Sequence, residues 1–456
     1  MIRLFNHFLS VRLVLLTIVE ALVIFQAVLL GFKMRSLGPV AAPWFEASSF
    51  TVVMMLMMTG LGLYQSQAEP FLSSFRRLLV AFALTLVLMS VLFYVFPATY
   101  VGRGTFLLVS LFTFTGVFLV RIFFFRVTDF GLPKRRVLVL GNGGEAEGVI
   151  KFLHQGARGR NIQYAGLYPV TTEKDLSGSG RRFNHDQLRR TIRDLRVSEV
   201  VIAVKERRGG VLPLRQLLDC KLDGVTVVDL VSFFERERGL LKVENLRASW
   251  LIFGTGFDQG LWRDVVKRMF DIVVSCSLLL LASPILIIAM IAVYMDGGRP
   301  VFYKQERIGQ GNKPFTIFKL RSMRQDAEVA GKPQWAQKND ARVTKVGNFL
   351  RKTRIDELPQ LFNVLRGDMS FVGPRPERQF FVDQLLEKIP FYDVRHSVKP
   401  GVTGWSQVRY PYGASVEDAL QKLQFDLYYV KNHSLFLDLL ILVETVQVVM
   451  LGKGAR

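Results

Sequence analysis

The chain has 456 residues, 50% of them apolar, and carries a formal net charge of +21. This length excludes a single ordinary domain, and the apolar fraction is high for a soluble enzyme. Two distant cysteines, Cys220 and Cys276, support neither a disulfide framework nor a zinc site. Because the cations form no patch interleaved with aromatic residues, they argue against a nucleic-acid partner. They indicate instead cations that flank membrane segments and face the anionic lipid headgroups.

Four apolar segments occupy the first part of the chain, at residues 13–32, 48–64, 78–97 and 105–125. Each approaches the ~20 residues that a bilayer requires, although the second is short and rich in methionine. Cations gather before the first segment, between the second and third, and after the fourth. This bias predicts a transmembrane four-helix region over 1–132, with the N-terminus and residue 130 onward in the cytoplasm. Glu20, inside the first segment, indicates a helix–helix contact, with a functional role as the alternative.

Residues 133–252 alternate short apolar runs with helical patterns, which predicts a Rossmann-like parallel α/β domain. The first run ends in a glycine turn, Gly141-Asn142-Gly143-Gly144. Position 146 is alanine where a dinucleotide fingerprint has its third glycine, and no ribose-binding acid ends the next run at Tyr168. A structural or regulatory domain and an occupied nucleotide site both remain open.

A further apolar segment of 27 residues, 269–295, would measure about 40 Å as a helix. Cations stand at both ends, at Arg263, Lys267 and Arg268 before it and at Arg299, Lys304 and Arg307 after it. Ser283-Pro284 lies at the centre, where proline removes a backbone donor. These features favour a re-entrant helix over 264–296 that breaks at Ser283 and Pro284 and returns to the same face. A kinked spanning helix is the alternative.

The last region, 253–456, contains two adjacent carboxylates, Asp356 and Glu357, after the cations Arg351, Lys352 and Arg354. Pro359 indicates that a new helix begins there. Cations suit phosphate, and carboxylates can bind metal or attack phosphorus, so the motif indicates magnesium-assisted phosphoryl transfer. A solvated helix start with a capping aspartate is the structural alternative.

Two stiff loops follow the carboxylates, each with a purely structural role as its alternative. Gly373-Pro374-Arg375-Pro376 holds one guanidinium on a rigid non-helical loop, which suits a pyrophosphate or a uracil. Residues 399–405 form the second loop, ahead of Gln407 and Arg409. The apolar run 434–450 carries Asp438 and Glu444, which favours an amphipathic helix in the interface or the core.

Eight ordered blocks between residues 255 and 456 resemble the monotopic polyprenyl-phosphate phosphoglycosyl transferases, the bacterial sugar transferase superfamily. The blocks span residues 267–271, 283–284, 305–309, 315–323, 351–363, 373–377, 399–405 and 426–430. The four apolar segments and the α/β region are similar to the large members, which initiate O-antigen and exopolysaccharide synthesis. The resemblance implies a membrane protein of class α plus α/β, with a four-helix transmembrane bundle, a Rossmann-like domain and a re-entrant-helix monotopic catalytic domain (α+β).

The resemblance also implies the reaction: a UDP-sugar and undecaprenyl phosphate give undecaprenyl-diphospho-sugar and UMP, at the cytoplasmic face of the bacterial inner membrane among its lipids. Asp356 would be the nucleophile of a covalent phosphosugar intermediate, and Glu357, with Asp356, would bind Mg²⁺. The expected phosphate and substrate contacts are Arg351, Arg354, Lys304, Arg307, Arg321, Gly373, Pro374, Arg375, Pro376 and Gln407.

Several expectations remain broad. The sugar is not defined by the sequence; glucose or galactose is the first expectation and an N-acetylated hexosamine the second. The additional domains suggest a homodimer. The competing hypothesis is a membrane-anchored nucleotide-binding oxidoreductase or regulator that works through residues 134–250.

Overall fold

A computed structural model describes residues 2–4, 7–35, 43–64, 71–97, 100–130, 134–156, 162–170, 185–204, 212–257, 260–324, 342–411, 413 and 415–450. The internal contacts divide the chain into two compact units. The first comprises Met1–Ile2 and Leu9–Phe233, and the second comprises Arg3–Phe8 and Phe234–Arg456. The predicted boundary at residues 132 and 133 lies outside the described residues.

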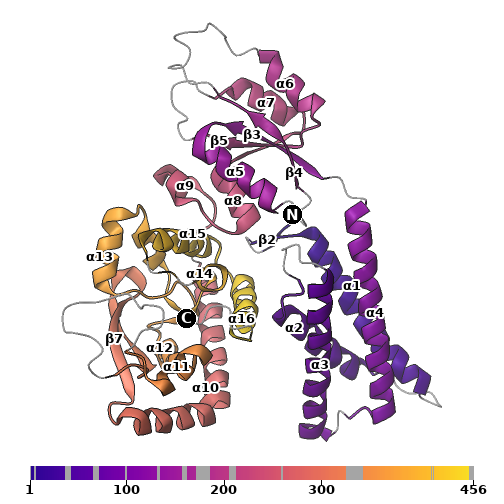
Figure 1. Cartoon of the computed structure of the whole chain (residues 1–456), viewed down its shortest axis with the longest axis vertical. Coiled ribbons are helices and arrows are strands. Elements are labelled where there is room, and N and C mark those ends of the chain that lie inside the picture. Colours follow the sequence, from indigo (N-terminus) through magenta and orange to yellow (C-terminus); the bar gives the residue numbers. More distant parts are fainter. Residues whose placement is uncertain are drawn as a thin grey trace. The chain divides into compact units, whose positions relative to one another are not determined.

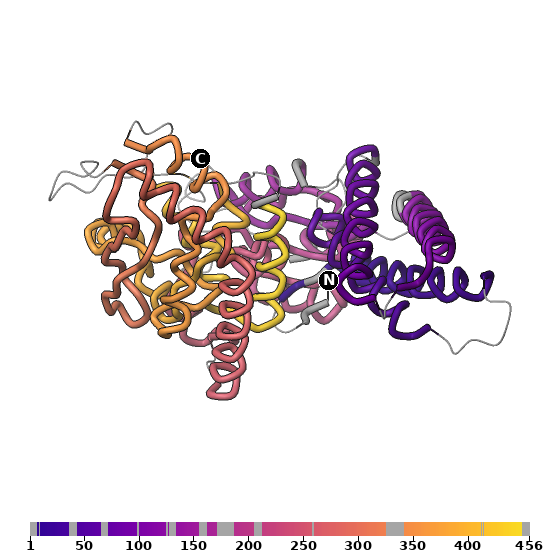
Figure 2. The backbone as a smooth tube through the Cα atoms, turned by 90° about the horizontal axis from the view of Figure 1, so that it is seen from below, coloured from indigo at the N-terminus to yellow at the C-terminus, as the bar shows by residue number. Residues whose placement is uncertain are grey.

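The four apolar segments at the start of the chain form four helices in the first unit (Figure 2, indigo to violet). They are α1 (Val11–Arg35), α2 (Trp44–Gly60), α3 (Phe71–Val95) and α4 (Arg103–Phe130). α1 packs against α2 and α4, and α2 packs against α3. By length and composition, α1 and most of α3 and α4 are long and apolar enough to cross a membrane, whereas α2 has 17 residues. The predicted four-helix region is therefore confirmed as helices, with the second the shortest.

Glu20 makes the helix–helix contact expected from the sequence. Its side chain is fully buried on α1, and its Oε1 lies 2.8 Å from Nε of Arg121 on α4. The Tyr64 hydroxyl donates a hydrogen bond to the other carboxylate oxygen. Because an unpaired carboxylate among apolar helices is costly, this pair fixes how α1 and α4 face each other.

The middle of the chain forms a parallel sheet, as the alternating pattern predicts (Figure 1). Its strands are β3 (Arg135–Gly141), β4 (Ile162–Tyr168), β5 (Glu199–Ala203) and β6 (Thr226–Asp229), in the order β4-β3-β5-β6. The helices that follow strands are α5 (Gly143–Gly156), α6 (His185–Asp194) and α7 (Leu214–Leu222). Residues 137–141 of β3 are all buried, because a central parallel strand is covered on both faces.

The glycine turn after β3 has a structural explanation. Gly141 has φ +154°, and a Cβ there would lie 2.0 Å from the carbonyl oxygen of Ala203 on the next strand. The Asn142 side chain exchanges hydrogen bonds with the backbone of Val170, which ties the turn to the segment after β4. Strand packing alone therefore requires glycine at the first position of the turn, so that glycine is no sign of a bound nucleotide.

The main part of the second unit starts at Phe234, within helix α8 (Leu230–Arg238), and continues through short helices that include α9 (Ala248–Phe253). Its strands are β7 (Phe302–Ile308), β8 (Pro314–Leu320), β9 (Ser370–Val372) and β10 (Gly401–Thr403), and its helices are α10 (Leu261–Gly297), α11 (Lys345–Thr353), α12 (Gln360–Arg366), α13 (Gln379–Lys388), α14 (Trp405–Arg409), α15 (Val416–Asn432) and α16 (Leu435–Met450). β7 pairs antiparallel with β8, and β9 pairs parallel with β10. The mixture of helices and short strands agrees with the α+β expectation, and the acids of α16, Asp438 and Glu444, are buried.

Residues 234–252, assigned from sequence to the α/β domain, group with the second unit. Buried Glu235 pairs with Lys431 at 2.8 Å, and the indole Nε1 of Trp405 donates to the Gly239 carbonyl at 2.7 Å. These contacts join positions 196 and 166 residues apart, so no local pattern marks the boundary.

Helix α10 contains Pro284 and is drawn as two limbs that meet at a bend (Figure 1). Proline is the usual cause of such a kink, and the Ser283 hydroxyl donates to the Leu280 carbonyl at 2.8 Å. Before the proline, Asp271 accepts the backbone N–H of Phe371 at 3.0 Å. After it, Leu286, Ala289 and Val293 pack with Leu320 and Leu350. Both limbs therefore pack on one body.

Candidate active site

The two adjacent carboxylates lie in a tight turn between two helices. α11 ends at Arg354, which has a left-handed backbone (φ 60°), and Ile355–Glu357 forms one 3-10 turn. α12 follows directly after Pro359, as the proline predicts. Successive side chains of a 3-10 turn point about 120° apart, so Asp356 and Glu357 face different surroundings although both are buried.

The turn is held by polar contacts to strand β8 and to the segment after it. Fully buried Asn363 of α12 accepts the Phe318 N–H at 3.1 Å and donates to the Thr316 carbonyl at 2.7 Å. From α11, Nε of Arg351 donates to the Ser322 hydroxyl at 2.9 Å. A Cβ at Gly347 would lie 2.0 Å from the Ser322 carbonyl oxygen, so only glycine allows α11 to pack this closely.

Glu357 is surrounded by three cations. Its Oε1 lies 3.1 Å from Nζ of Lys319 and 2.9 Å from the guanidinium of Arg375, and its Oε2 lies 3.4 Å from Arg354. Burial works to raise the pKa of Glu357, but the combined charges of Lys319, Arg375 and Arg354 hold the pKa well below its usual range. Glu357 is therefore ionised at neutral pH and fixes the cations in one place.

Asp356 has the opposite electrostatic character. Burial, reinforced by the negative charge of Glu357, raises the pKa of Asp356 to about 6 despite Lys319 and the nearby arginines. Its Oδ1 is buried and accepts no hydrogen bond from the described residues. A desolvated carboxylate that lacks hydrogen bonds is more nucleophilic than a solvated one, so Asp356 is suited to attack an electrophile.

Arg375 reaches Glu357 from the predicted rigid loop, residues 373–376, which is non-helical as expected. The loop is tied to the second loop by the Gly373 N–H to the Thr403 carbonyl and the Gly401 N–H to the Pro374 carbonyl, both 2.9 Å. A Cβ at Gly373 would lie 2.3 Å from the Lys399 carbonyl oxygen. The backbones of the two loops are thus in direct contact, and Arg375 projects from a stiff support.

The structure brings together only part of the predicted set. Glu357 contacts Arg354 and Arg375 directly, and Arg351 and Arg354 lie close enough to lower the pKa of Asp356. Arg307 donates to the Pro376 carbonyl at 3.3 Å, so it supports the loop from β7.

The other predicted contacts lie elsewhere. Arg321 donates to the Gly298 carbonyl at 2.9 Å, at the end of α10. Lys304 lies over the Phe318 ring, with 5.7 Å from Nζ to the ring centroid. Gln407 on α14 donates weakly to the Val402 carbonyl, and its Oε1 is buried with no hydrogen-bond partner in the described part of the chain.

Two residues of this arrangement were not predicted from sequence. Lys319 contacts Glu357 from β8, where it is an isolated cation in the apolar run Phe315–Leu320, and that isolation was a usable signal. Buried Arg395 donates to the Arg375 carbonyl at 2.8 Å and pairs with Asp426 at 2.9 Å. Arg395 also donates to the hydroxyl of nearby Tyr392 at 2.7 Å, but its two contacts with the site come from other elements, so no local pattern distinguishes it.

The residues present fit a magnesium ion in part. Magnesium is usually held by one or two carboxylates together with substrate phosphates, and the unpartnered Oδ1 of Asp356 is such a ligand. Glu357 is less available, since cations contact both of its oxygens. Among the described residues no three acidic, histidine or cysteine side chains form a metal cluster, so substrate oxygens would complete the coordination.

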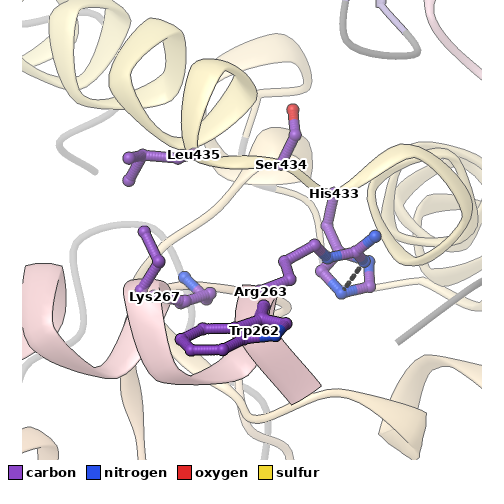
Figure 3. Close-up of a pocket in the computed structure, with 7 residues that line it drawn as sticks. Trp262, Arg263, Lys267, His433, Ser434 and Leu435 are labelled. Carbon is purple, nitrogen blue, oxygen red and sulfur yellow. Dashed lines mark hydrogen bonds between the residues drawn. The ribbon is translucent and has the colours of Figure 1, made fainter. Parts of the chain in front are cut away.

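A separate cavity of about 250 Å³ lies at the start of α10, and its residues are not those of the carboxylate site (Figure 3). It is lined by Trp262, Arg263, Val266, Lys267, His433, Ser434 and Leu435. Arg263 extends across it to the ring of His433, with which it forms a hydrogen bond. Its position beside the first limb of α10 separates it from the reacting groups.

The fold and the site define a membrane-associated domain in which a buried carboxylate stands beside a cluster of cations. Residues 262–452 match the bacterial sugar transferase family, and the chain belongs to this family.

Similar proteins extend the match. The UDP-N-acetylgalactosamine-undecaprenyl-phosphate N-acetylgalactosaminephosphotransferase of Aeromonas hydrophila is 42% identical over 242 residues, 53% of this chain and 56% of that protein. The UDP-glucose:undecaprenyl-phosphate glucose-1-phosphate transferase of Klebsiella pneumoniae is 44% identical over 193 residues, 42% of this chain and 41% of that protein. The protein of the same description from Xanthomonas campestris pv. campestris is 33% identical over 352 residues, 74% of this chain and 71% of that protein. The chain thus spans about half of the first two relatives.

Proposed function

We propose that this protein transfers a sugar-1-phosphate from a UDP-sugar to undecaprenyl phosphate, giving undecaprenyl-diphospho-sugar and UMP. The observation that carries the proposal is the pairing of Asp356, buried with one unpartnered oxygen, with the cation-bound Glu357 in the matched region. The relatives named for this reaction support it. The reaction would begin exopolysaccharide or O-antigen synthesis.

The chemistry divides into two displacements at one phosphorus. An oxygen of the Asp356 carboxylate attacks the sugar-bearing phosphorus of the UDP-sugar, the bond to the bridging oxygen breaks, and UMP leaves with the electron pair. A phosphate oxygen of undecaprenyl phosphate then attacks the same phosphorus and expels Asp356 as a carboxylate. Arg375 and Arg354 are placed to neutralise the phosphates, while Glu357 holds these cations in position.

We propose Mg²⁺ as the cofactor, held by Asp356 together with phosphate oxygens of the donor, because cations already contact both oxygens of Glu357. When bound, the ion would neutralise phosphate charge and favour departure of UMP. In this proposal the rigid loop 373–376 orients the nucleotide, with Gln407 as a further contact.

The membrane arrangement is part of the proposal. α10 enters the inner leaflet and returns at Ser283 and Pro284, which keeps both limbs against the cytoplasmic catalytic unit. Support comes from the packing of both limbs on one body and from the exposure of Leu280, Leu281 and Ile288 around the bend. Apolar side chains exposed on this scale belong in lipid. The polyprenyl carrier then meets the soluble donor at the bilayer surface of the inner membrane.

The test is UMP release by the purified full chain in the presence of undecaprenyl phosphate and a panel of UDP-sugars. UDP-N-acetylgalactosamine and UDP-glucose come first, since the relatives are named for these donors. Glycine-turn variants at Gly141 and Gly143 serve as the control for the competing oxidoreductase or regulator hypothesis. Loss of activity only in those variants would favour that hypothesis, and no UMP from any donor would refute the transferase.

The fall of kcat/KM at acid pH, the acid limb of the pH profile, should follow the protonation of Asp356. Because the nucleophile is the ionised carboxylate and its pKa is raised to about 6, kcat/KM should rise with pH and level off above that value. Below it the rate should fall roughly tenfold per pH unit. Initial rates between pH 4.5 and 8 measure this directly. A limb centred near pH 4 would contradict the assignment.

A further inference from the structure

The segment that precedes the first membrane helix contributes a histidine to the core of the second unit. His7 begins strand β2 (His7–Leu9), which pairs with β1 (Ile2–Leu4), and residues 3–8 group with residues 234–456 by contact. The His7 side chain is buried, and its Nδ1 lies 2.7 Å from the hydroxyl of Tyr428. His7 and Tyr428 are 421 residues apart in the sequence, so this hydrogen bond forms only when the chain folds.

His7 completes an aromatic cluster around Trp405. Its ring meets the Trp405 ring edge-on, with 5.7 Å between centroids, and Trp405 stacks on Tyr428 at 6.0 Å. The Trp405 indole also donates to the Gly239 carbonyl. Trp405 and Tyr428 are almost fully buried, so each has little room to move while His7 fills the remaining side.

Residues next to this cluster contact the start of the loop that carries Arg375. Gly404 precedes Trp405, and a Cβ on Gly404 would lie 2.2 Å from the Gly373 carbonyl oxygen, so the two backbones touch. Tyr429, next to Tyr428, donates to the Val372 carbonyl at 2.9 Å. Both contacts end at the start of the 373–376 loop.

We propose that His7 is a positioning residue for the transferase site. By fixing Trp405 and Tyr428 it holds residues 401–405 against the 373–376 loop, and so holds Arg375 where it meets Glu357 and the donor phosphates. The inference rests on the proposed function for the role of Arg375. It assigns the segment before the membrane helix to the catalytic unit.

The His7–Tyr428 hydrogen bond joins two neutral groups. Burial, reinforced by the charge of Arg409, lowers the pKa of His7 to about 4, so the imidazole is uncharged near pH 7. A buried neutral hydrogen bond makes a modest contribution, and its loss changes rates by roughly 3- to 10-fold.

The experiment compares His7→Phe, Tyr428→Phe and the double variant in the full chain. His7→Phe keeps a ring in place and removes the hydrogen bond. Each single variant should lower kcat/KM for the UDP-sugar roughly 3- to 10-fold through a higher KM, and the double variant should be no worse than the singles. KM for undecaprenyl phosphate and the fall in rate at acid pH should not change, because the cluster supports only the loop that carries Arg375. A general loss of folded protein would leave both KM values unchanged, so a selective rise in KM for the UDP-sugar distinguishes positioning from misfolding.

A second measurement does not depend on activity. Hydrogen exchange of the peptide 399–410 should become faster in His7→Ala, while the peptide 199–204 of β5 should exchange as before. The matched control is His154→Ala, which should leave the exchange of peptide 399–410 unchanged, since exposed His154 also meets a tyrosine ring edge-on, Tyr164 at 5.2 Å, but in the α/β region.

The two claims fail in different ways. Unchanged exchange of peptide 399–410 in His7→Ala, or multiplicative losses in the double variant, would overturn the positioning role. A wild-type protein that releases no UMP would overturn the proposed function, and the exchange experiment would still test His7.

Discussion

Asp356→Asn should abolish UMP release, with a loss of at least roughly 10³-fold in kcat. An amide cannot form the bond to phosphorus that the proposed first displacement needs. The variant should fold as well as the wild type, because asparagine removes the repulsion between Asp356 and Glu357 and the cost of burying a second charge. Steady-state rates and thermal unfolding measure both parts of this expectation.

The covalent route makes a sharper statement about the same residue. With UDP-sugar and no undecaprenyl phosphate, the wild type should release about one UMP per site and gain the mass of one sugar phosphate on Asp356. Asp356→Asn should do neither. Asp393→Asn, an exposed carboxylate of the same unit, is the matched control and should behave as wild type. Direct attack by the lipid phosphate would instead give no burst and no adduct in any variant.

The regular elements were largely readable from the sequence. Continuous apolar runs predicted α1, α3, α4 and α10, and short buried runs predicted β3 and β5, because membrane helices and central parallel strands are apolar on all sides. The turn at Asp356 and the helix after Pro359 followed from proline chemistry. Such features depend on neighbouring residues alone.

What the sequence could not supply depends on distant residues. Arg321 resembled the other cations as a phosphate ligand, yet it donates to carbonyls at the end of α10, which depends on where that helix stops in space. Arg395 and His7 have partners far away in the chain, and no periodicity encodes them. The same holds for residues 234–252, which Trp405 and Lys431 join to the second unit.

Glu357→Gln should give the second large effect, a loss of both stability and activity. The cause is that the cations around Glu357 are no longer held in place, because Glu357 is not the nucleophile. The substitution removes the carboxylate charge that contacts Lys319, Arg375 and Arg354. Breaking a buried ion pair from one side costs about 3 kcal/mol, so the melting temperature should fall. We expect kcat to fall roughly 10²-fold, since misplaced cations no longer stabilise the transferred phosphoryl group. Thermal unfolding and UMP release measure the two effects.

A double variant separates the effect of Glu357 on stability from its effect on activity. Adding Lys319→Met to Glu357→Gln removes both partners of the most buried of the three ion pairs, so much of the stability should return while activity stays low. In Glu357→Gln alone, the acid limb of the pH profile should move below pH 6, because the negative charge that raises the pKa of Asp356 is gone and the cations remain. An acid limb that stays at its wild-type position would show that Asp356 is not the titrating group. If Glu357→Gln kept full activity despite lower stability, Glu357 would be a structural anchor alone, and the arginines would need another group to position them.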